Sequence, residues 1–384
     1  MKKTFTRREA LVLGGLAGLT PLVPPMAFAQ DAGALPDTMI WTAYDVGSTG
    51  YNEASAVADA LMKKYGTRIR LLPSGTSIGR IQPLQAERAQ YGWLATETFF
   101  AAEGLYDFAA KDQGPQDVRV VLGRPAGFGI VVTGESGIKS MEDLKGKRLA
   151  WVPANTSVNV KVMAMLAFAD MTLDDVELVT LPSYGASLKA LVDGTADAAG
   201  TSPTAATLRE LEASPRGIGW IPVPADNKEG WERLTAVAPF FAPSKQTIGA
   251  GMSEENPAEL MAYKYPMIVT YASTSEDEVY ALTKAVAESF DLYKGASPVM
   301  ELWNVKESGT PPADAPFHEG AVRYLKEAGV WTAEHDAWQK QRIEQLEAVK
   351  ALWKETLAAA EKESIADDKF AEFWTERREQ ALAK

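Results

Sequence analysis

Six turns rich in glycine, serine and threonine recur along this 384-residue chain, each between an apolar run and a helical pattern. The first, Tyr44 to Tyr51, follows the apolar run 39–43 and precedes a helix that the spacing of apolar residues predicts from Asn52. A strand that turns into a helix in this way leaves backbone N–H groups free at the positive end of the helix dipole. Such a turn can hold an anion or another polar group. The other five turns are residues 74–78, 96–98, 155–158, 183–187 and 201–204.

Together these turns have the chemistry of a binding site for a small anion. In an open parallel sheet, ligands bind beyond the carboxyl ends of the strands, where such turns gather. Any single turn can equally be an ordinary helix cap, because Ser, Thr and Asn are the usual capping residues. Their recurrence in both halves of the chain favours a shared cleft, with Thr49 and Tyr184 among its candidate ligand contacts.

Basic residues near the turns are few. Any of them could pair with a carboxylate of the ligand, although a surface charge is the simpler interpretation of each. Arg124 is the best candidate, because it lies where we expect the chain to cross from one lobe to another. The others are Arg80, Lys161 and Lys245.

A competing motif is the G-x-S-x-G nucleophile elbow, which Gly75, Ser77 and Gly79 match between a predicted strand and a predicted helix. An exported serine hydrolase would explain it. No glycine-rich oxyanion segment precedes the motif, however, and the two histidines, His318 and His335, fall in the helical C-terminal part, where we expect them to be solvated. We therefore predict a binding protein with no catalytic residues.

The sequence also lacks a recognised metal-ligand spacing, since its two histidines lie seventeen residues apart and it has no cysteine. A calcium site built from carboxylates alone stays open. We predict neither a metal nor a cofactor.

Strands alternating with helices predict an α/β fold of mostly parallel sheets covered by helices. The length exceeds that of one ordinary core and suggests two lobes. We expect lobe 1 to comprise residues 30–124 and 245–300, lobe 2 residues 125–244, and a helical C-terminal extension residues 301–384. Two strands, 118–122 and 128–132, are expected on either side of a turn at 123–127.

The N-terminus has the pattern of an export signal. Charged residues at positions 2, 3, 7 and 8 precede an apolar run, and Ala27-Phe28-Ala29 supplies a cleavage site after Ala29. The adjacent Arg7 and Arg8 resemble a twin-arginine signal, with an ordinary secretory start as the alternative. The run is too short and too rich in glycine and proline to span a membrane. We expect a soluble periplasmic protein that does not itself insert into a membrane.

The formal net charge of −12 is a further constraint on partners. A surface this acidic disfavours nucleic acid and anionic membranes. Because the chain has no cysteine, its stability must come from burial of a core, and thiol chemistry is excluded.

These motifs, in this order, resemble the TAXI-type solute receptors of tripartite ATP-independent periplasmic (TRAP) transporters. Residues 43–51 resemble the family's A-T-G-x-x-G-x-Y opening, although Tyr44 and Asp45 stand where small residues are usual. Residues 73–77 are similar to its T-G-G-S turn, and Asp143-Leu-Lys-Gly-Lys-Arg148 to the start of its second lobe. Residues 173–176, 190–198 and 279–285 are similar to later segments of the family.

The resemblance implies a two-lobed periplasmic-binding-protein fold (type II-like) that closes on a small organic anion, an amino acid or a di- or tricarboxylate. It also implies delivery of that anion to TRAP membrane permease subunits; a metabolite-sensing module would bind ligand equally well. The C-terminal stripe of apolar residues would brace lobe 1, with a dimer or permease contact as the alternative. The implied ligand contacts are Gly50, Tyr51, Ser77, Thr96, Asn155, Thr156, Ser157, Thr201 and Ser202.

Overall fold

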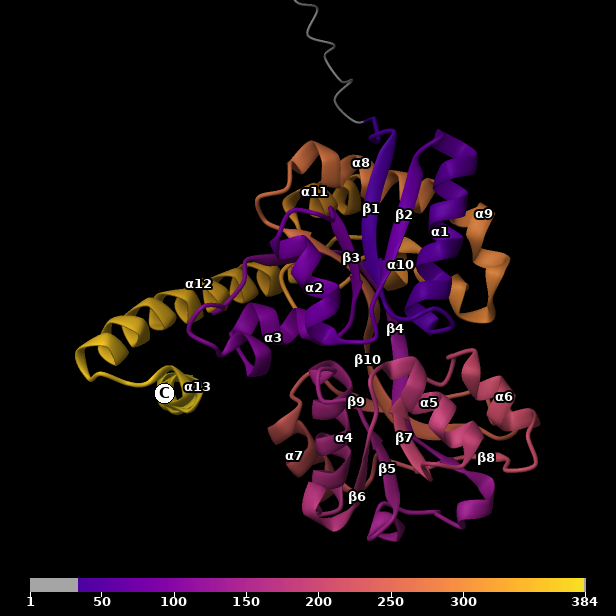
Figure 1. The fold of residues 1–384 in the computed structure, drawn as a ribbon. Helices are drawn as coiled ribbons and strands as arrows, with labels where there is room; N and C mark the ends of the chain where they lie inside the picture. The colour runs from indigo at the N-terminus through magenta and orange to yellow at the C-terminus, as the bar shows by residue number, and fades with distance from the viewer. Residues whose placement is uncertain (1–33, 383–384) are drawn as a thin grey trace, which may run out of the picture.

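The computed structural model describes residues 34–382 of the chain. The predicted export signal, residues 1–29, lies outside these residues. Figure 1 shows two groups of strands covered by helices, one above the other, and a helical C-terminal arm that projects to one side. The mixed α/β fold class with a helical C-terminal part, predicted from the sequence, is confirmed.

The upper group, which we call lobe 1, is built on three parallel strands, and a helix follows each of them. The strands pair in the order β2-β1-β3. Its core contains Trp41, Trp93 and Trp303, all fully buried. The elements are β1 (Thr38–Ala43), α1 (Thr49–Tyr65), β2 (Arg68–Pro73), α2 (Ser77–Gln85), β3 (Tyr91–Leu94) and α3 (Glu97–Glu103), with α8 (Glu276–Glu288), α9 (Phe290–Tyr293), α10 (Val305–Ser308) and α11 (Glu319–Glu327) from the later chain.

The lower group, lobe 2, repeats the plan with strands in the order β7-β5-β6, again parallel. A second core cluster, separate from that of lobe 1, fills it. Its elements are β5 (Arg148–Trp151), α4 (Thr156–Phe168), β6 (Glu177–Thr180), α5 (Tyr184–Asp193), β7 (Ala198–Thr201), α6 (Thr207–Ala213), β8 (Ile218–Trp220), α7 (Lys228–Val237) and β9 (Ala242–Gln246).

Two long strands run between the lobes and pair with each other in antiparallel fashion, β4 (Val118–Thr133) and β10 (Ala258–Tyr271). The two shorter strands expected at 118–122 and 128–132 are thus one continuous strand, and the turn expected at 123–127 is wrong. Gly123 and Gly127 lie in the strand with no positive φ. Pro125 is tolerated because it lies opposite a bulge in β10, after Lys264, where the regular ladder is interrupted.

The C-terminal arm consists of α12 (Ala333–Lys362) and α13 (Asp367–Leu382). The first part of α12 packs on lobe 1, where Leu346 joins the core. Its second part packs against α13 instead, as Trp353 and Trp374 meet edge to face at 4.8 Å. Both helices are tied to α3, because Arg342 of α12 and Arg378 of α13 form ion pairs with Glu103.

Candidate functional site

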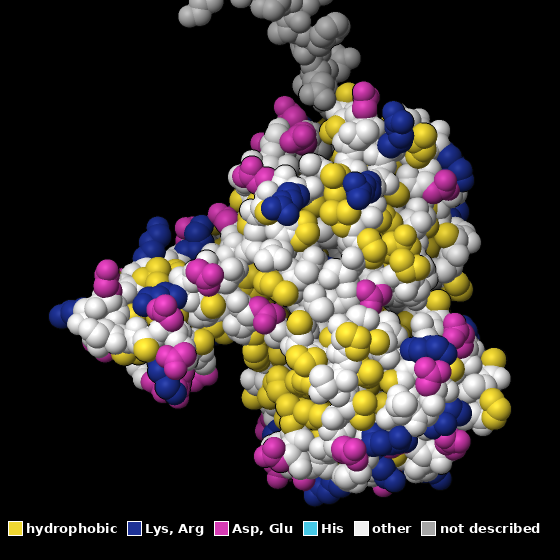
Figure 2. All heavy atoms as spheres, viewed as in Figure 1, with side chains coloured by type: hydrophobic (Ala, Val, Ile, Leu, Met, Phe, Trp, Pro, Cys, Tyr) yellow, Lys and Arg dark blue, Asp and Glu magenta, His cyan; other side chains and the backbone are white. Residues whose placement is uncertain are grey.

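The six predicted turns meet at the junction of the two lobes, where the carboxyl ends of both sets of parallel strands face each other (Figure 1). In-register pairing places the ends of neighbouring strands level, since Ala43 pairs with Pro73 and Trp151 with Thr180. Figure 2 shows the two lobes in direct contact with each other. The turns of one lobe therefore reach those of the other.

Helix capping accounts for some of the hydroxyl groups in the turns. Ser48, Thr76 and Ser183 each accept a hydrogen bond from a backbone N–H group in the first turn of the following helix. The hydroxyl of Ser77 and the amide of Asn155 do not cap their own helices and bond each other instead. This difference separates ordinary caps from the residues that join the lobes.

A buried network around Ser77 links the lobes directly. Ser77 Oγ donates to Asn155 Oδ1 at 3.1 Å and accepts from the backbone N–H of Ser157 at 3.0 Å. All three residues are at most 1% exposed. Ser157 Oγ, also buried, has no hydrogen-bond partner among residues 34–382. The junction thus holds a free hydroxyl as well as satisfied ones.

A second set of contacts involves Asp45, which follows β1. Its Oδ2 accepts a hydrogen bond of 2.8 Å from the N–H of Gly185 at the start of α5. A side chain at Gly75 would come within 2.5 Å of Asp45 and Ser183, so this approach of the lobes requires glycine there. The carboxylate of Asp45 occupies the helix N-terminus, which is a favourable position for an anion.

Aromatic rings fill the centre of the junction. The ring of Tyr44 meets those of Tyr184 and Tyr265 edge to face, with centroids 5.4 and 5.7 Å apart. Tyr263 stacks on Tyr265 at 5.6 Å. They enclose a cavity of about 10 Å³, enough for roughly one water molecule. Its lining residues are Tyr44, Phe128, Val158, Lys161, Tyr184, Ser202, Tyr263 and Tyr265.

Lys161, on α4, supplies the positive charge of this cavity. Its Nζ lies 4.0 Å from the ring centroid of Tyr263 and 4.9 Å from that of Phe128. The residue is 1% exposed, and no ion pair or hydrogen bond joins its ammonium group to any residue of the described chain. Burial lowers the pKa of Lys161 to about 7. The carboxyl groups of Glu97 and Asp314 oppose this shift through space, but neither forms an ion pair with Lys161. A negative group in the cavity would offset the remaining cost of burying the ammonium group.

Arg80, on α2, holds the neighbouring side chains in place. Its guanidinium carbon lies 3.3 Å from the ring centroid of Tyr44, and its Nε donates to Glu97 at 2.8 Å. It also donates to Ser77 Oγ at 3.3 Å. Arg80 and Glu97 are fully buried. Arg80 therefore positions Ser77 and Tyr44 while its own charge is paired.

The surface location expected for Arg80 and Lys161 is wrong, since both are buried at the junction. A signal was available in their spacing. Arg80 lies three residues after Ser77, and Lys161 four residues after Ser157, which places each on the same helix face as a turn residue.

Arg124, the predicted ligand cation, is buried in an ion pair of its own. Its Nε donates to Glu53 Oε2 at 2.8 Å, and the indole N–H of Trp303 donates to the same oxygen at 2.6 Å. Its charge is therefore already paired within lobe 1, and Lys161 is the cation that faces the central cavity.

The other predicted contacts fall into three groups. Three join parts of the chain across the junction: Thr49 bonds Thr204, Gly50 donates to the hydroxyl of Tyr265, and Thr156 bonds Asp107. Two line the cavity: Tyr184, which bonds Thr201, and Ser202. Two do neither: Tyr51 packs on the core of lobe 1, and the buried hydroxyl of Thr96 has no partner within residues 34–382.

The nucleophile elbow lacks a base. His318 is 1% exposed, not solvated as expected, because it caps α11 and bonds the carbonyl of Thr274 at 3.0 Å. Burial lowers its pKa. His335 lies half-buried at the start of α12. Within the described residues neither histidine bonds Ser77, whose hydroxyl is committed to Asn155.

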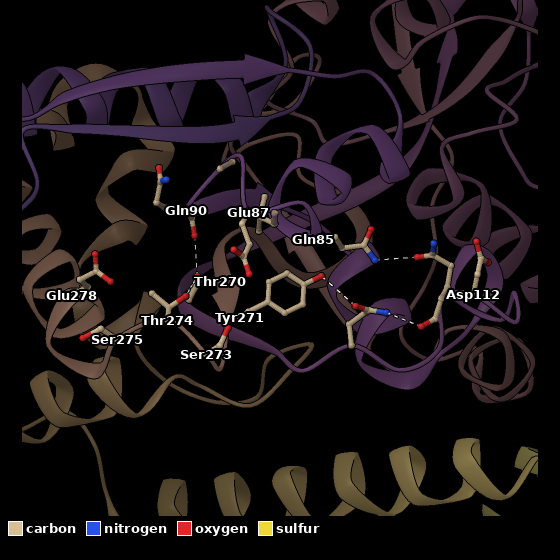
Figure 3. A pocket seen from close by; sticks show the side chains of 14 residues that line it. Gln85, Glu87, Gln90, Asp112, Thr270, Tyr271, Ser273, Thr274, Ser275 and Glu278 are labelled. Carbon is tan, nitrogen blue, oxygen red and sulfur yellow. Dashed lines mark hydrogen bonds between the residues drawn. The ribbon is translucent and has the colours of Figure 1, made fainter. Parts of the chain in front are cut away.

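A cavity of about 890 Å³ lies away from the junction in lobe 1 (Figure 3). Its side-chain amides bond one another, as Gln85 does with Gln113 at 3.0 Å, or nearby main chain, as Gln116 does with Gly114. We place the candidate site at the junction instead, because an unpaired buried cation lies there.

Across residues 34–382, no group of three or more histidine, aspartate or glutamate side chains is arranged to hold a metal ion. In the same part of the chain, no helix combines the length and apolar character needed to cross a membrane.

Comparisons with known proteins identify the family. Several solved structures of solute-binding proteins show a distant likeness. An ancestral arginine-binding protein bound to arginine is 16% identical, with a TM-score of 0.42 over 70% of this chain and 99% of that one. The alkanesulfonate-binding protein SsuA from Xanthomonas axonopodis pv. citri, bound to MOPS, is 13% identical, with a TM-score of 0.44 over 77% and 92%. The pattern of the NMT1-like family matches residues 43–329, about three quarters of the sequence, and the chain belongs to this family.

Proposed function

We propose that the protein is a periplasmic solute receptor that captures a small organic anion between its two lobes. The observation that carries this proposal is the ammonium group of Lys161, which is buried beside the central cavity and forms no direct ion pair with another residue of the described chain. A carboxylate in the cavity would pair with Lys161 in a low-dielectric setting, where charge-assisted hydrogen bonds are strong. The unpartnered hydroxyl of Ser157 offers a further donor.

The aromatic walls suggest how the body of the ligand is held. Tyr44, Tyr184 and Tyr265 provide flat apolar faces, and their hydroxyls provide polar edges. The 10 Å³ cavity is too small for an amino acid or a dicarboxylate, so ligand entry requires the lobes to move apart. β4 and β10, which cross the junction, are the natural hinge, and closure over a ligand is a common motion of two-lobed proteins.

We further propose that the protein delivers the anion to TRAP permease subunits. The ordered motifs that resemble TAXI receptors and the export signal support this proposal. The candidate ligands are amino acids and di- or tricarboxylates. We propose the predicted division of the chain, with lobe 1 at 30–124 and 245–300, lobe 2 at 125–244 and an extension at 301–384. Within that extension α10 and α11 pack with the core of lobe 1, and α12 and α13 form the arm. We also propose that the protein is exported by the twin-arginine route.

A thermal-shift screen of the mature protein tests the proposal. Organic acids and amino acids are compared with their neutral amides or methyl esters, because a ligand that binds only the folded state raises the Tm. We expect at least one anion to raise the Tm while its neutral counterpart does not. Equal shifts by acids and neutral analogues, or no shift by any anion, would exclude an anion receptor.

A further inference from the structure

A second cavity lies where lobe 1, lobe 2 and α12 meet. Its volume is about 630 Å³, within the range of small-molecule sites. Phe99 comes from α3, Phe240 and Phe241 from the segment after α7, and Trp338 from α12. Tyr263 of β10 lines both this groove and the central cavity. We call it the arm groove, since the C-terminal arm forms one of its walls.

The aromatic rings of the arm groove form a connected series. Phe99 and Phe240 lie 5.3 Å apart between centroids, Phe240 and Phe241 4.8 Å, and Phe241 and Tyr263 5.5 Å. Phe99, Phe240 and Trp338 are only half-buried, so part of each ring is available to a bound molecule. Planar ligands stack well in such surroundings.

One oxygen of a buried carboxyl group in the groove lacks a hydrogen-bond partner, although the charges of Lys161 and Arg342 act on this group through space. Asp314 is 4% exposed, and its buried Oδ2 accepts no hydrogen bond from residues 34–382. Arg342 does not supply one, because it donates to the main-chain carbonyl of Asp314 and forms an ion pair with Glu103. A buried, unpartnered carboxylate oxygen favours a ligand that brings a donor.

We propose that the arm groove binds a small neutral aromatic molecule that carries an N–H or O–H donor. The ring would lie among Phe240, Phe241 and Trp338, and the donor would bond Asp314. An anion would meet the unpartnered carboxylate of Asp314. A cation would meet Lys264 and Arg342, which share the lining. Apart from Tyr263, the site differs from the central cavity in its lining residues, and it also differs in its volume and in the charge of its ligand.

The test uses indole and N-methylindole as probes, because they differ chiefly in the N–H donor. The full mature protein is labelled with 5-fluorotryptophan, and the ¹⁹F resonance of Trp338 is assigned from Trp338→Phe. We expect indole to shift that resonance saturably, and N-methylindole to bind at least tenfold more weakly. An unmoved Trp338 resonance at millimolar indole, or equal affinities for the two probes, would overturn the proposal.

Three variants locate the contacts. Asp314→Leu should abolish the preference for indole over N-methylindole, and Phe240→Ala should weaken both probes by about tenfold or more. Tyr65→Ala removes an aromatic residue that is 40% exposed on α1 and should leave both affinities unchanged. If Phe240→Ala also has no effect, the indole site lies elsewhere. The thermal-shift screen with anions is a separate measurement, so either proposal can fail alone.

Discussion

The carboxylate of Asp45 in lobe 1 accepts a 2.8 Å hydrogen bond from the N–H of Gly185 in lobe 2. The protein thus places its own negative charge at the N-terminus of α5, a position that could otherwise hold an anionic group of a ligand. Asp45 and its neighbour Tyr44 are the residues that differ most from the TAXI receptors that the sequence resembles. We therefore expect this contact to influence the choice of ligand.

Replacement of this charge should broaden the range of ligands. Asp45→Asn keeps the size of the side chain and an acceptor for Gly185, but it removes a negative charge from the junction. We expect affinity for dicarboxylates to rise by about tenfold relative to monocarboxylates, because one repulsive charge is lost. Isothermal titration calorimetry with matched mono- and dicarboxylates measures the ratio. An unchanged ratio would show that Asp45 does not select ligand charge.

The network between Ser77 and Asn155 should contribute to binding through closure of the lobes. Asn155→Ala leaves the Ser77 hydroxyl without its acceptor, and we expect ligand affinity to fall by about tenfold, the equivalent of one or two hydrogen bonds. Circular dichroism should show a folded protein. Asn256→Ala, in an exposed loop, is the matched control. Equal affinities in the two variants would move the site away from this network.

The buried pair of Arg80 and Glu97 should be strongly coupled. Arg80→Met leaves a fully buried carboxylate unpaired, and we expect the free energy of unfolding to fall by about 3–5 kcal/mol. Adding Glu97→Gln should recover part of this loss. Urea unfolding of the single and double variants measures the coupling. Additive losses would mean that the two side chains act independently.

The same pair predicts a dependence of stability on pH. Burial alone would raise the pKa of Glu97, but the charge and hydrogen bond of Arg80 outweigh it, so the pKa lies below the ordinary 4.5. A lowered carboxyl pKa stabilises the folded state above pH 4.5, and this contribution is lost as the pH falls through the folded pKa. In wild type we expect a loss of stability below pH 4.5 that is smaller in the Arg80→Met, Glu97→Gln double variant.

Proton uptake should accompany ligand binding. Burial lowers the pKa of Lys161 to about 7, and a bound anion would raise it by favouring the charged form. Above pH 7 the ligand must therefore bind together with a proton, and affinity should fall by up to about tenfold per pH unit. Calorimetry in buffers of different ionisation enthalpy detects the uptake. Affinity that is independent of pH from 7 to 9 would contradict a titrating Lys161.

The local plan of the chain could be predicted from its sequence. The turns at 74–78 and 155–158 were recognisable because strand, turn and helix signals depend on nearby residues. Their meeting at the junction also follows from a general rule for parallel sheets. Ser77 and Asn155 were placed together on these grounds.

The charges of the site were harder to predict. Arg80, Lys161 and His318 are polar residues whose burial depends on partners far away in the sequence, such as Glu97 and the β10 tyrosines, and a single sequence does not reveal these. The continuity of β4 was missed for a similar reason. Its glycines and Pro125 are typical of a turn when only nearby residues are considered, but pairing with the neighbouring strand β10 keeps this segment extended.

The most direct test of an anion site at the lobe junction is the affinity of the Lys161→Met variant for an organic anion that stabilises the wild-type protein. Lys245→Met, at an exposed lysine of β9, serves as the matched control. We expect calorimetry to show at least about a thirtyfold loss of affinity in Lys161→Met and no change in Lys245→Met, because the first variant removes the ammonium group that lines the central cavity. Wild-type affinity in a folded Lys161→Met protein would contradict an anion site at the lobe junction.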